Sequence, residues 1–270
     1  MDKALLDLYS DYLLSSFSLT TATGLASLVD NAVSHDQITR FLGQPRYDQK
    51  EYWQVIKPVV RQVEQDDGLI LVDDTIEEKP YTDESELVCY HYDHSQGRSV
   101  KGINLLNFVY HVTTPQGEGI SIPVAYEVVT KPDVYRDPKT DKYKRRSEVS
   151  KNELARQRLK ILSQINQVRF KYVVNDIWFS SKEKMNWIKT ELYKEFVMAL
   201  KDNRLVALSA QDKAQGRFVA LVDVDLKPGQ GRLVYLKGVE FPVIVAKQVF
   251  TNQDGSTGIL SGFQRYHLDL

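Results

Sequence analysis

The chain has 270 residues, a formal net charge of −1 and a single cysteine. The length suits one large domain or two small ones. The lone Cys89 excludes a disulfide framework and a cysteine-based zinc site. No apolar run approaches the ~20 residues of a membrane-spanning helix. The acidic N-terminus is unlike a signal peptide, so we expect a cytoplasmic protein. With a near-neutral charge, any contact with nucleic acid must depend on local basic patches.

Residues 1–66 are predicted to be helical. Apolar residues recur at helical spacing from Leu5 onward, and Ser34 is a good N-cap for a short helix. The tight connection before Ser34 is typical either of a helix-turn-helix, whose second helix would carry Arg40 into a DNA major groove, or of a plain helical bundle. We assign residues 1–66 as a helical, DNA-binding domain.

Two apolar segments run directly into acidic residues. Residues 69–72 lead into Asp73 and Asp74, and residues 170–174 lead towards Asp176. Continuous apolar runs are typical of strands buried on both faces, and acids at the C-terminal ends of such strands lie where α/β sheets place their chemistry. The plain alternative is a strand followed by an acidic turn. If the two strands are neighbours, their acids can hold a divalent metal ion.

The order of the core elements predicts the fold class. Strands over 103–112 and 120–129 are joined by a glycine-containing turn, which indicates an antiparallel hairpin. A helix follows from Ser147, with Leu154, Leu159, Ile161 and Ile165 on its apolar face. The strand that ends at Asp176, a second helix and a fifth strand come next. This is the order of a ribonuclease-H-like fold, in which the first and fourth strands are neighbours. We therefore predict an α/β chain with a ribonuclease-H-like mixed sheet over residues 67–202, in which Asp74 lies beside Asp176.

Two basic segments are candidates for contact with phosphates. The loop 90–98 contains His91, Asp93 and His94, whose spacing fits no standard zinc site, and we interpret this loop as lying near a polyanionic substrate. The segment 139–160 is the most basic in the chain, and its charges indicate either phosphate contacts or a solvated helix face. The candidate DNA-binding residues are Arg40, Arg98, Lys101, Arg145, Arg146, Lys151 and Arg156.

The C-terminal part of the chain is predicted to be rich in β structure. Short apolar segments are separated by turns, of which the Pro-Gly-Gln-Gly turn at 228–231 is the clearest. We assign residues 203–260 as an all-β insertion attached to the core, and residues 261–270 as an aberrant tail.

Three stretches of the sequence resemble the DDE transposases of the IS4-like and IS701-like insertion sequences. They are Val-Asp-Asp-Thr at 72–75, Tyr-His-Tyr-Asp-His-Ser-x-Gly-Arg-Ser-Val-Lys-Gly-Ile-Asn at 90–104, and Asn-Asp-Ile-Trp-Phe-Ser-Ser at 175–181. The resemblance extends from the helical N-terminus to about Leu260. It implies a ribonuclease-H-like core with a β insertion before the last catalytic helix, and cut-and-paste movement of DNA with two divalent metal ions.

The resemblance also implies roles for individual residues. The first acid of the family matches Asp74, which directly precedes Thr75, with Asp73 as the alternative, and the second matches Asp176. Both would bind Mg²⁺ or Mn²⁺, which prefer carboxylate and water oxygens. The implied partner is DNA that carries the terminal inverted repeats of the transposon, with a homodimer on the DNA as a further expectation.

The sequence departs from the family at the third acid. Family members carry a Glu in a Tyr-x2-Arg-x3-Glu-x6-Lys pattern on a helix after the insertion, whereas no Glu follows Glu240 here. The tail from Ser261 can be reverse-translated into codons that, when they are read one base out of step, encode the Leu-Val-Ser-Asn of family members. We therefore expect a frameshift that truncates the chain and removes this acid. Sequencing the gene tests the idea, because an Arg-x3-Glu-x6-Lys pattern must then follow in another frame.

Three functions are consistent with these residues. The first is a transposase by descent whose catalytic site is incomplete. The second is a catalytically inactive DNA-binding protein that competes with the full-length transposase. The third is another ribonuclease-H-like nuclease, such as a junction resolvase, against which the β insertion argues.

Overall fold

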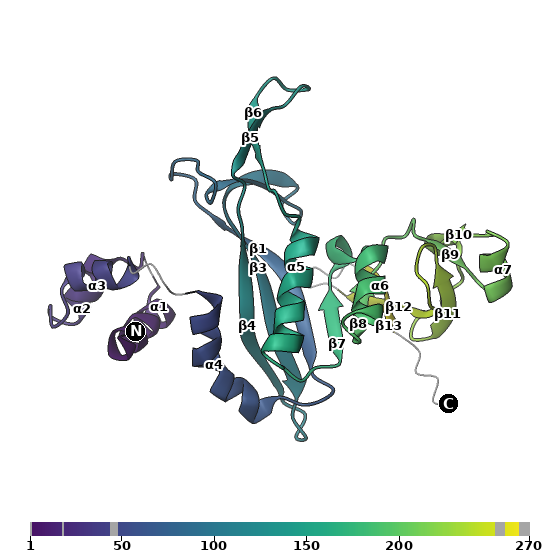
Figure 1. Ribbon diagram of the computed structural model, residues 1–270, viewed down its shortest axis with the longest axis horizontal. Helices are drawn as coiled ribbons and strands as arrows, with labels where there is room; N and C mark the ends of the chain where they lie inside the picture. Colours follow the sequence, from purple (N-terminus) through teal and green to yellow (C-terminus); the bar gives the residue numbers. More distant parts are fainter. Residues whose placement is uncertain (1, 18, 44–47, 252–256, 265–270) are drawn as a thin grey trace. The chain divides into compact units, whose positions relative to one another are not determined.

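The structure is a computed structural model that describes residues 2–17, 19–43, 48–251 and 257–264 (Figure 1). The chain divides into two compact units, residues 1–55 and 56–270. Helix α4 (Gln49–Val63) runs through the boundary in the sequence between them. No helix among the described residues is long and apolar enough to cross a membrane.

The first unit contains three short helices, α1 (Lys3–Ser15), α2 (Ala22–Leu28) and α3 (His35–Leu42). Each begins at a side-chain cap, and the cap of α3 is a full capping box in which Ser34 and Gln37 satisfy each other's backbone N–H groups. A small apolar core joins the three helices and contains Tyr12, Leu25, Ala26 and Ile38. The choice between a helix-turn-helix and a plain bundle stays a prediction.

The second unit is organised around a mixed sheet, which confirms the predicted fold class. Strand β1 pairs in parallel with β7, which pairs in parallel with β8, while β3 lies antiparallel on the other side of β1 and pairs with both β2 and β4. The order β4-β3-β1-β7-β8 is that of a ribonuclease-H-like core. The core strands are β1 (Leu69–Glu78), β2 (Cys89–Asp93), β3 (Arg98–Thr113), β4 (Gly119–Val129), β7 (Tyr172–Asn175) and β8 (Glu195–Ala199).

The local sequence explains why the central strands pack closely. Alternate residues of β3 are buried along almost its whole length, as expected for a strand with one face in the core. At Gly102 the strand approaches β1 so closely that a Cβ atom would lie 2.2 Å from the carbonyl oxygen of Glu77. Only glycine allows this approach, which brings the C-terminal half of β1 against β3.

Helix α5 (Lys151–Lys160) lies alongside the sheet and continues into a π-helical turn at Ile161–Ile165 (Figure 1). It begins after the Ser150 cap rather than at Ser147, where the sequence led us to expect it. Ala155, Leu159 and Leu162 are fully buried, whereas Ile165, which we expected on the buried face, is 74% exposed. A π turn changes the number of residues per turn, so the spacing of an ideal α-helix no longer applies there.

The remaining elements of the second unit are a small hairpin, helix α6 and a set of strands beyond β8. The hairpin consists of β5 (Asp133–Arg136) and β6 (Tyr143–Arg146), and α6 spans Lys182–Thr190. The last region also contains a short helix, α7 (Ala210–Ala214). Its strands are β9 (Leu205–Ala207), β10 (Val219–Ala220), β11 (Gly231–Leu236), β12 (Val243–Thr251) and β13 (Thr257–Gln264).

The strands of this last region extend the core sheet at its β8 edge. The order is β8-β13-β12-β11-β9-β10, and residues 262–264 of β13 pair with residues 197–199 of β8. Residues 261–264, which we assigned to an aberrant tail, therefore belong to β13, while residues 265–270 lie outside the described part of the chain.

Candidate active site

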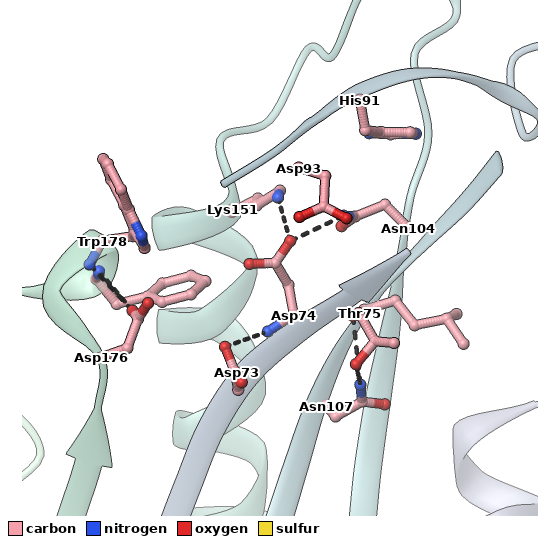
Figure 2. Close-up of polar contacts among 12 residues, drawn as sticks. Asp73, Asp74, Thr75, His91, Asp93, Asn104, Asn107, Lys151, Asp176 and Trp178 are labelled. Carbon is pink, nitrogen blue, oxygen red and sulfur yellow. Dashed lines mark hydrogen bonds and ion pairs between the residues drawn. The ribbon is translucent and has the colours of Figure 1, made fainter. Parts of the chain in front are cut away.

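The predicted acids lie where the pairing of β1 with β7 ends. Asp176 directly follows β7, as expected, whereas Asp73 and Asp74 lie in the middle of β1, which continues to Glu78 along β3 rather than ending at the acids. Val72 of β1 is in register with Asn175 of β7, and this is the last residue pair between the two strands. Asp74 follows Val72 by two residues, and Asp176 follows Asn175 by one. Neighbouring strands are about 4.8 Å apart. Asp73, Asp74 and Asp176 all line one cavity of about 460 Å³. Figure 2 shows the three carboxylates around this strand end.

Asp74 is held by two side chains from other parts of the fold (Figure 2). Its Oδ2 atom accepts a hydrogen bond of 2.8 Å from Asn104 Nδ2 on β3, and it forms an ion pair of 2.5 Å with Lys151 Nζ at the start of α5. Lys151 was predicted to contact DNA. In this structure its ammonium group instead neutralises the carboxylate that we expected to bind metal.

Asp73 points to the other face of β1, because side chains alternate along a strand. It is exposed, and its Oδ1 atom accepts a hydrogen bond of 2.8 Å from the backbone N–H of Asp74. Burial raises the pKa of Asp176, and the negative charge of Asp73 contributes more to this rise than that of Asp74. The choice of Asp74 over Asp73 as the first metal ligand therefore stays a prediction.

Asp176 is oriented by its own turn. Its Oδ1 atom accepts hydrogen bonds from the backbone N–H groups of Trp178 at 3.0 Å and Phe179 at 3.3 Å, at the start of a 3₁₀ turn over Ile177–Phe179. Burial and two neighbouring acids raise its pKa even though these hydrogen bonds act in the opposite direction. A cation in the cavity would relieve this repulsion.

The loop that follows β2 completes the wall of the cavity. Asp93 also lines it, but its oxygens accept hydrogen bonds from Ser95 and Gln96. The hydroxyl of Ser95 and the groups of Gln96 hold the pKa of Asp93 below its ordinary value. In the described part of the chain, no group of three or more His, Cys, Asp or Glu side chains is arranged to hold a metal ion.

The His91 side chain lies in the interior of this loop region. It is only 3% exposed, and its Nε2 atom lies 3.3 Å from Cys89 Sγ. Burial and the positive charges of Lys131 and Lys151 lower the pKa of His91 to about 4, so the ring is neutral at pH 7.

Most of the candidate DNA-binding residues already have a partner within the protein. Arg98 pairs with Glu78, Arg145 with Glu84, Arg146 with Asp133 and Arg156 with Glu153, while Arg40 donates to the carbonyl oxygen of Asp36. Lys101 is half-buried on β3. Of this set, only Lys151 contacts one of the predicted metal ligands. Their role in DNA binding stays a prediction.

Sequence reasoning did not single out three residues beside the acids. Asn104 orients Asp74, Trp178 stacks on His94 with ring centroids 3.6 Å apart, and Lys184 is 1% exposed. Asn104 and Trp178 belong to the stretches that resemble the transposases, so a signal for them was present. Lys184 gave no signal, because its burial depends on how α6 packs against the rest of the fold.

The site and the fold together define a nuclease-like arrangement, in which acids of the two central parallel strands line one cavity. A family model described as DDE superfamily endonuclease matches residues 2–217, which is most of the chain. The chain belongs to this family, whose members generally depend on divalent metals and act on DNA. No curated protein matches the chain.

The residues of the cavity fit a hard divalent cation in their donor chemistry. Carboxylate oxygens are the ligands that Mg²⁺ and Mn²⁺ prefer. Burial is the main cause of the raised pKa of Asp176, and the charges of Asp73 and Asp74 add to it, so that the cavity concentrates negative charge. Asp74, with Asp73 as the alternative, and Asp176 remain the predicted ligands of such an ion.

Proposed function

We propose that the chain is a transposase of the IS4-like or IS701-like kind, which cuts and rejoins DNA at the terminal inverted repeats of its element. Its metal ligands are Asp74 and Asp176, its cofactor is Mg²⁺ or Mn²⁺, and it acts in the cytoplasm as a homodimer on the DNA. The observation that supports this best is that both acids line one cavity, beside the point where the pairing of β1 with β7 ends.

In this mechanism the protein positions the carboxylates. Two backbone N–H groups orient Asp176, and Asn104 orients Asp74. When bound, divalent metal ions activate a water or a 3′-hydroxyl and stabilise the leaving oxygen of the phosphodiester. Lys151 pairs with the Oδ2 atom of Asp74, so an ion held by that oxygen would compete with the ammonium group, and the displaced ammonium group would be free to contact a phosphate.

The proposed site has no counterpart of the third acid of the transposases. The sequence contains no Tyr-x2-Arg-x3-Glu-x6-Lys pattern, so that the proposal assigns metal-binding roles to Asp74 and Asp176 alone. We therefore expect weak metal binding and little strand transfer from this chain by itself.

One observation favours an alternative function, a catalytically inactive DNA-binding protein that competes with the full-length transposase. The ion pair between Lys151 and Asp74 already satisfies the first carboxylate without a metal. A protein of this kind would bind the inverted repeats and leave them uncut.

A binding and nicking experiment tests the two functions. The substrate is DNA with the inverted repeats that flank the gene, and Mn²⁺ is the metal. We expect binding in a gel-shift assay and slow nicking, which Asp74→Ala and Asp176→Ala abolish and the exposed control Asp225→Ala does not. Binding without any nicking supports the competitor. Nicking that survives both alanine variants would show that the catalytic site lies elsewhere, and robust strand transfer would contradict the missing third acid.

A further inference from the structure

A second cavity also has Trp178 among its lining residues, and it is basic. It has a volume of about 830 Å³ and is formed by the segment that leads into α6 and by residues near β9 and β11. Four of its lining residues are cationic, namely Lys182, Lys201, Arg204 and Lys237, and none of them is acidic. This composition is the opposite of that of the neighbouring cavity, which Asp73, Asp74, Asp93 and Asp176 line.

The cations of this cavity are mostly free of carboxylate partners. Lys201 Nζ lies 4.5 Å from the centre of the Trp178 ring, Lys237 Nζ lies 5.6 Å from that of Phe218, and Arg204 Nη2 donates to the carbonyl oxygen of Ser180. Within the described ranges of the chain, these three cations have no Asp or Glu at ion-pair distance.

The fourth cation of the cavity, Lys182, has only a weak partner. Its Nζ atom lies 3.7 Å from a carboxylate oxygen of Glu183, and both side chains are more than half exposed, so that this pair contributes little. In contrast, Arg98, Arg145, Arg146 and Arg156 in the predicted DNA-binding set are each paired with an acid. The cations of the cavity are therefore more available to bind an external anion than the paired arginines of the predicted DNA-binding set.

Trp178 connects the basic cavity to the candidate active site. Its side chain lines both cavities, and its backbone N–H donates to Asp176. Successive phosphates of one DNA strand are separated by about 3.4 Å along the helix axis. A strand that places one phosphate at the carboxylates and continues past Trp178 therefore brings its next phosphates to the lysines.

We propose that this basic cavity binds the phosphates of the DNA strand that adjoin the phosphodiester at the carboxylates. The inference rests on the proposed function and adds to it the surface that holds the substrate. Contacts of this kind carry no base specificity, because they involve the phosphate oxygens alone. The contribution of the cavity should therefore be the same for DNA of any sequence and should weaken as salt is added.

The test compares the wild-type chain with the Lys201→Gln/Lys237→Gln double variant. Both lysines are exposed, so that the change should leave the fold intact. The matched control is Lys227→Gln, an exposed lysine of the same region that does not line the cavity. Binding to a fluorescein-labelled DNA duplex of mixed sequence is followed by anisotropy over a series of NaCl concentrations, without divalent metal.

We expect the double variant to bind more weakly and to depend less on salt. Each phosphate contact contributes about 0.9 to the slope of log affinity against log salt concentration, so that two lost contacts should reduce the slope by about 2. The control should stay within about 0.5 of the wild-type slope. Thermal melting by circular dichroism confirms that all three proteins are folded.

Other outcomes separate the inference from the proposed function. If the double variant keeps the wild-type slope while the wild type binds and nicks DNA, the inference is wrong and the proposed function stands. If inorganic phosphate protects the wild type from thermal unfolding, but the double variant keeps the wild-type DNA slope, the cavity is a site for small anions and the inference is again wrong. If the wild type binds no DNA, the proposed function and the inference both fail.

Discussion

The substitution Lys184→Met should stabilise the protein at neutral pH. Lys184 is 1% exposed on α6, and its Nζ atom has no hydrogen-bond partner among the described residues, although it lies 4.8 Å from the centre of the Phe179 ring. Burial lowers its pKa from 10.5 to about 7, an effect that the charge of Asp176 opposes and that of Arg156 reinforces. Methionine has a similar shape and no charge to bury.

The size of the effect follows from the difference between the two pKa values. The unfolded chain binds a proton at this lysine up to pH 10.5, whereas the folded chain loses it near pH 7. One pKa unit corresponds to about 1.4 kcal/mol. At pH 7 the free energy of unfolding of the wild type is therefore lower by roughly 4 kcal/mol than that of a protein with a side chain that does not titrate at this position. Because the folded pKa is lowered, this loss should decrease as the pH rises from 7 to 10.5.

Urea unfolding at a series of pH values measures this difference. The Lys184→Met variant should exceed the wild type in free energy of unfolding by up to about 4 kcal/mol at pH 7 and by progressively less towards pH 10. The control Lys182→Met, two residues earlier and 54% exposed, should change the value by less than about 0.5 kcal/mol at any pH. A less stable Lys184→Met variant, or a difference that does not change with pH, would refute the reasoning.

Two further substitutions test the packing of the core. Glu64 is buried, and although burial acts to raise its pKa, hydrogen bonds from the Arg169 backbone and from Arg61 lower it overall. Glu64→Gln should therefore lower the free energy of unfolding by about 3 kcal/mol at pH 7. This loss should diminish below pH 4.5, because the wild-type carboxylate is then protonated. An unchanged urea midpoint at pH 7 would contradict the prediction. Gly102→Ala should lower the free energy of unfolding by about 3 kcal/mol, because its Cβ atom would meet Glu77. Gly117→Ala should cost less, because Gly117 has open space around it and only the strain of a positive φ. Equal shifts in melting temperature for the two variants would contradict this prediction.

The predictions from sequence were reliable where they depended on local pattern. The run from Leu69 into Asp74 is a strand of the central sheet, and the order of strands and helices gave the ribonuclease-H-like topology that the structure shows. They were less accurate where the backbone leaves ideal geometry. The π turn after Lys160 exposes Ile165, which an ideal α-helix would have placed on the buried face.

Contacts between distant residues could not be read from the sequence. Lys151 looked like one more cation in a basic segment, yet it lies on Asp74, which is 77 residues away in the chain. The arginines near it looked available for DNA and are mostly paired with acids from other elements. Whether a charged side chain is free depends on what the fold places beside it, and a single sequence does not contain that information.

The sequence by itself determined the family, the order of the core elements and the acid that follows β7, because each of these depends on local periodicity and short motifs. It did not determine where β1 ends, because that strand continues past Asp74 along β3 to Glu78. Only the tertiary structure decided which cations face those acids and which face a cavity of their own. The physical reason is that charge pairing and burial are set by side chains that meet across the sheet, at separations in the chain that no local pattern records.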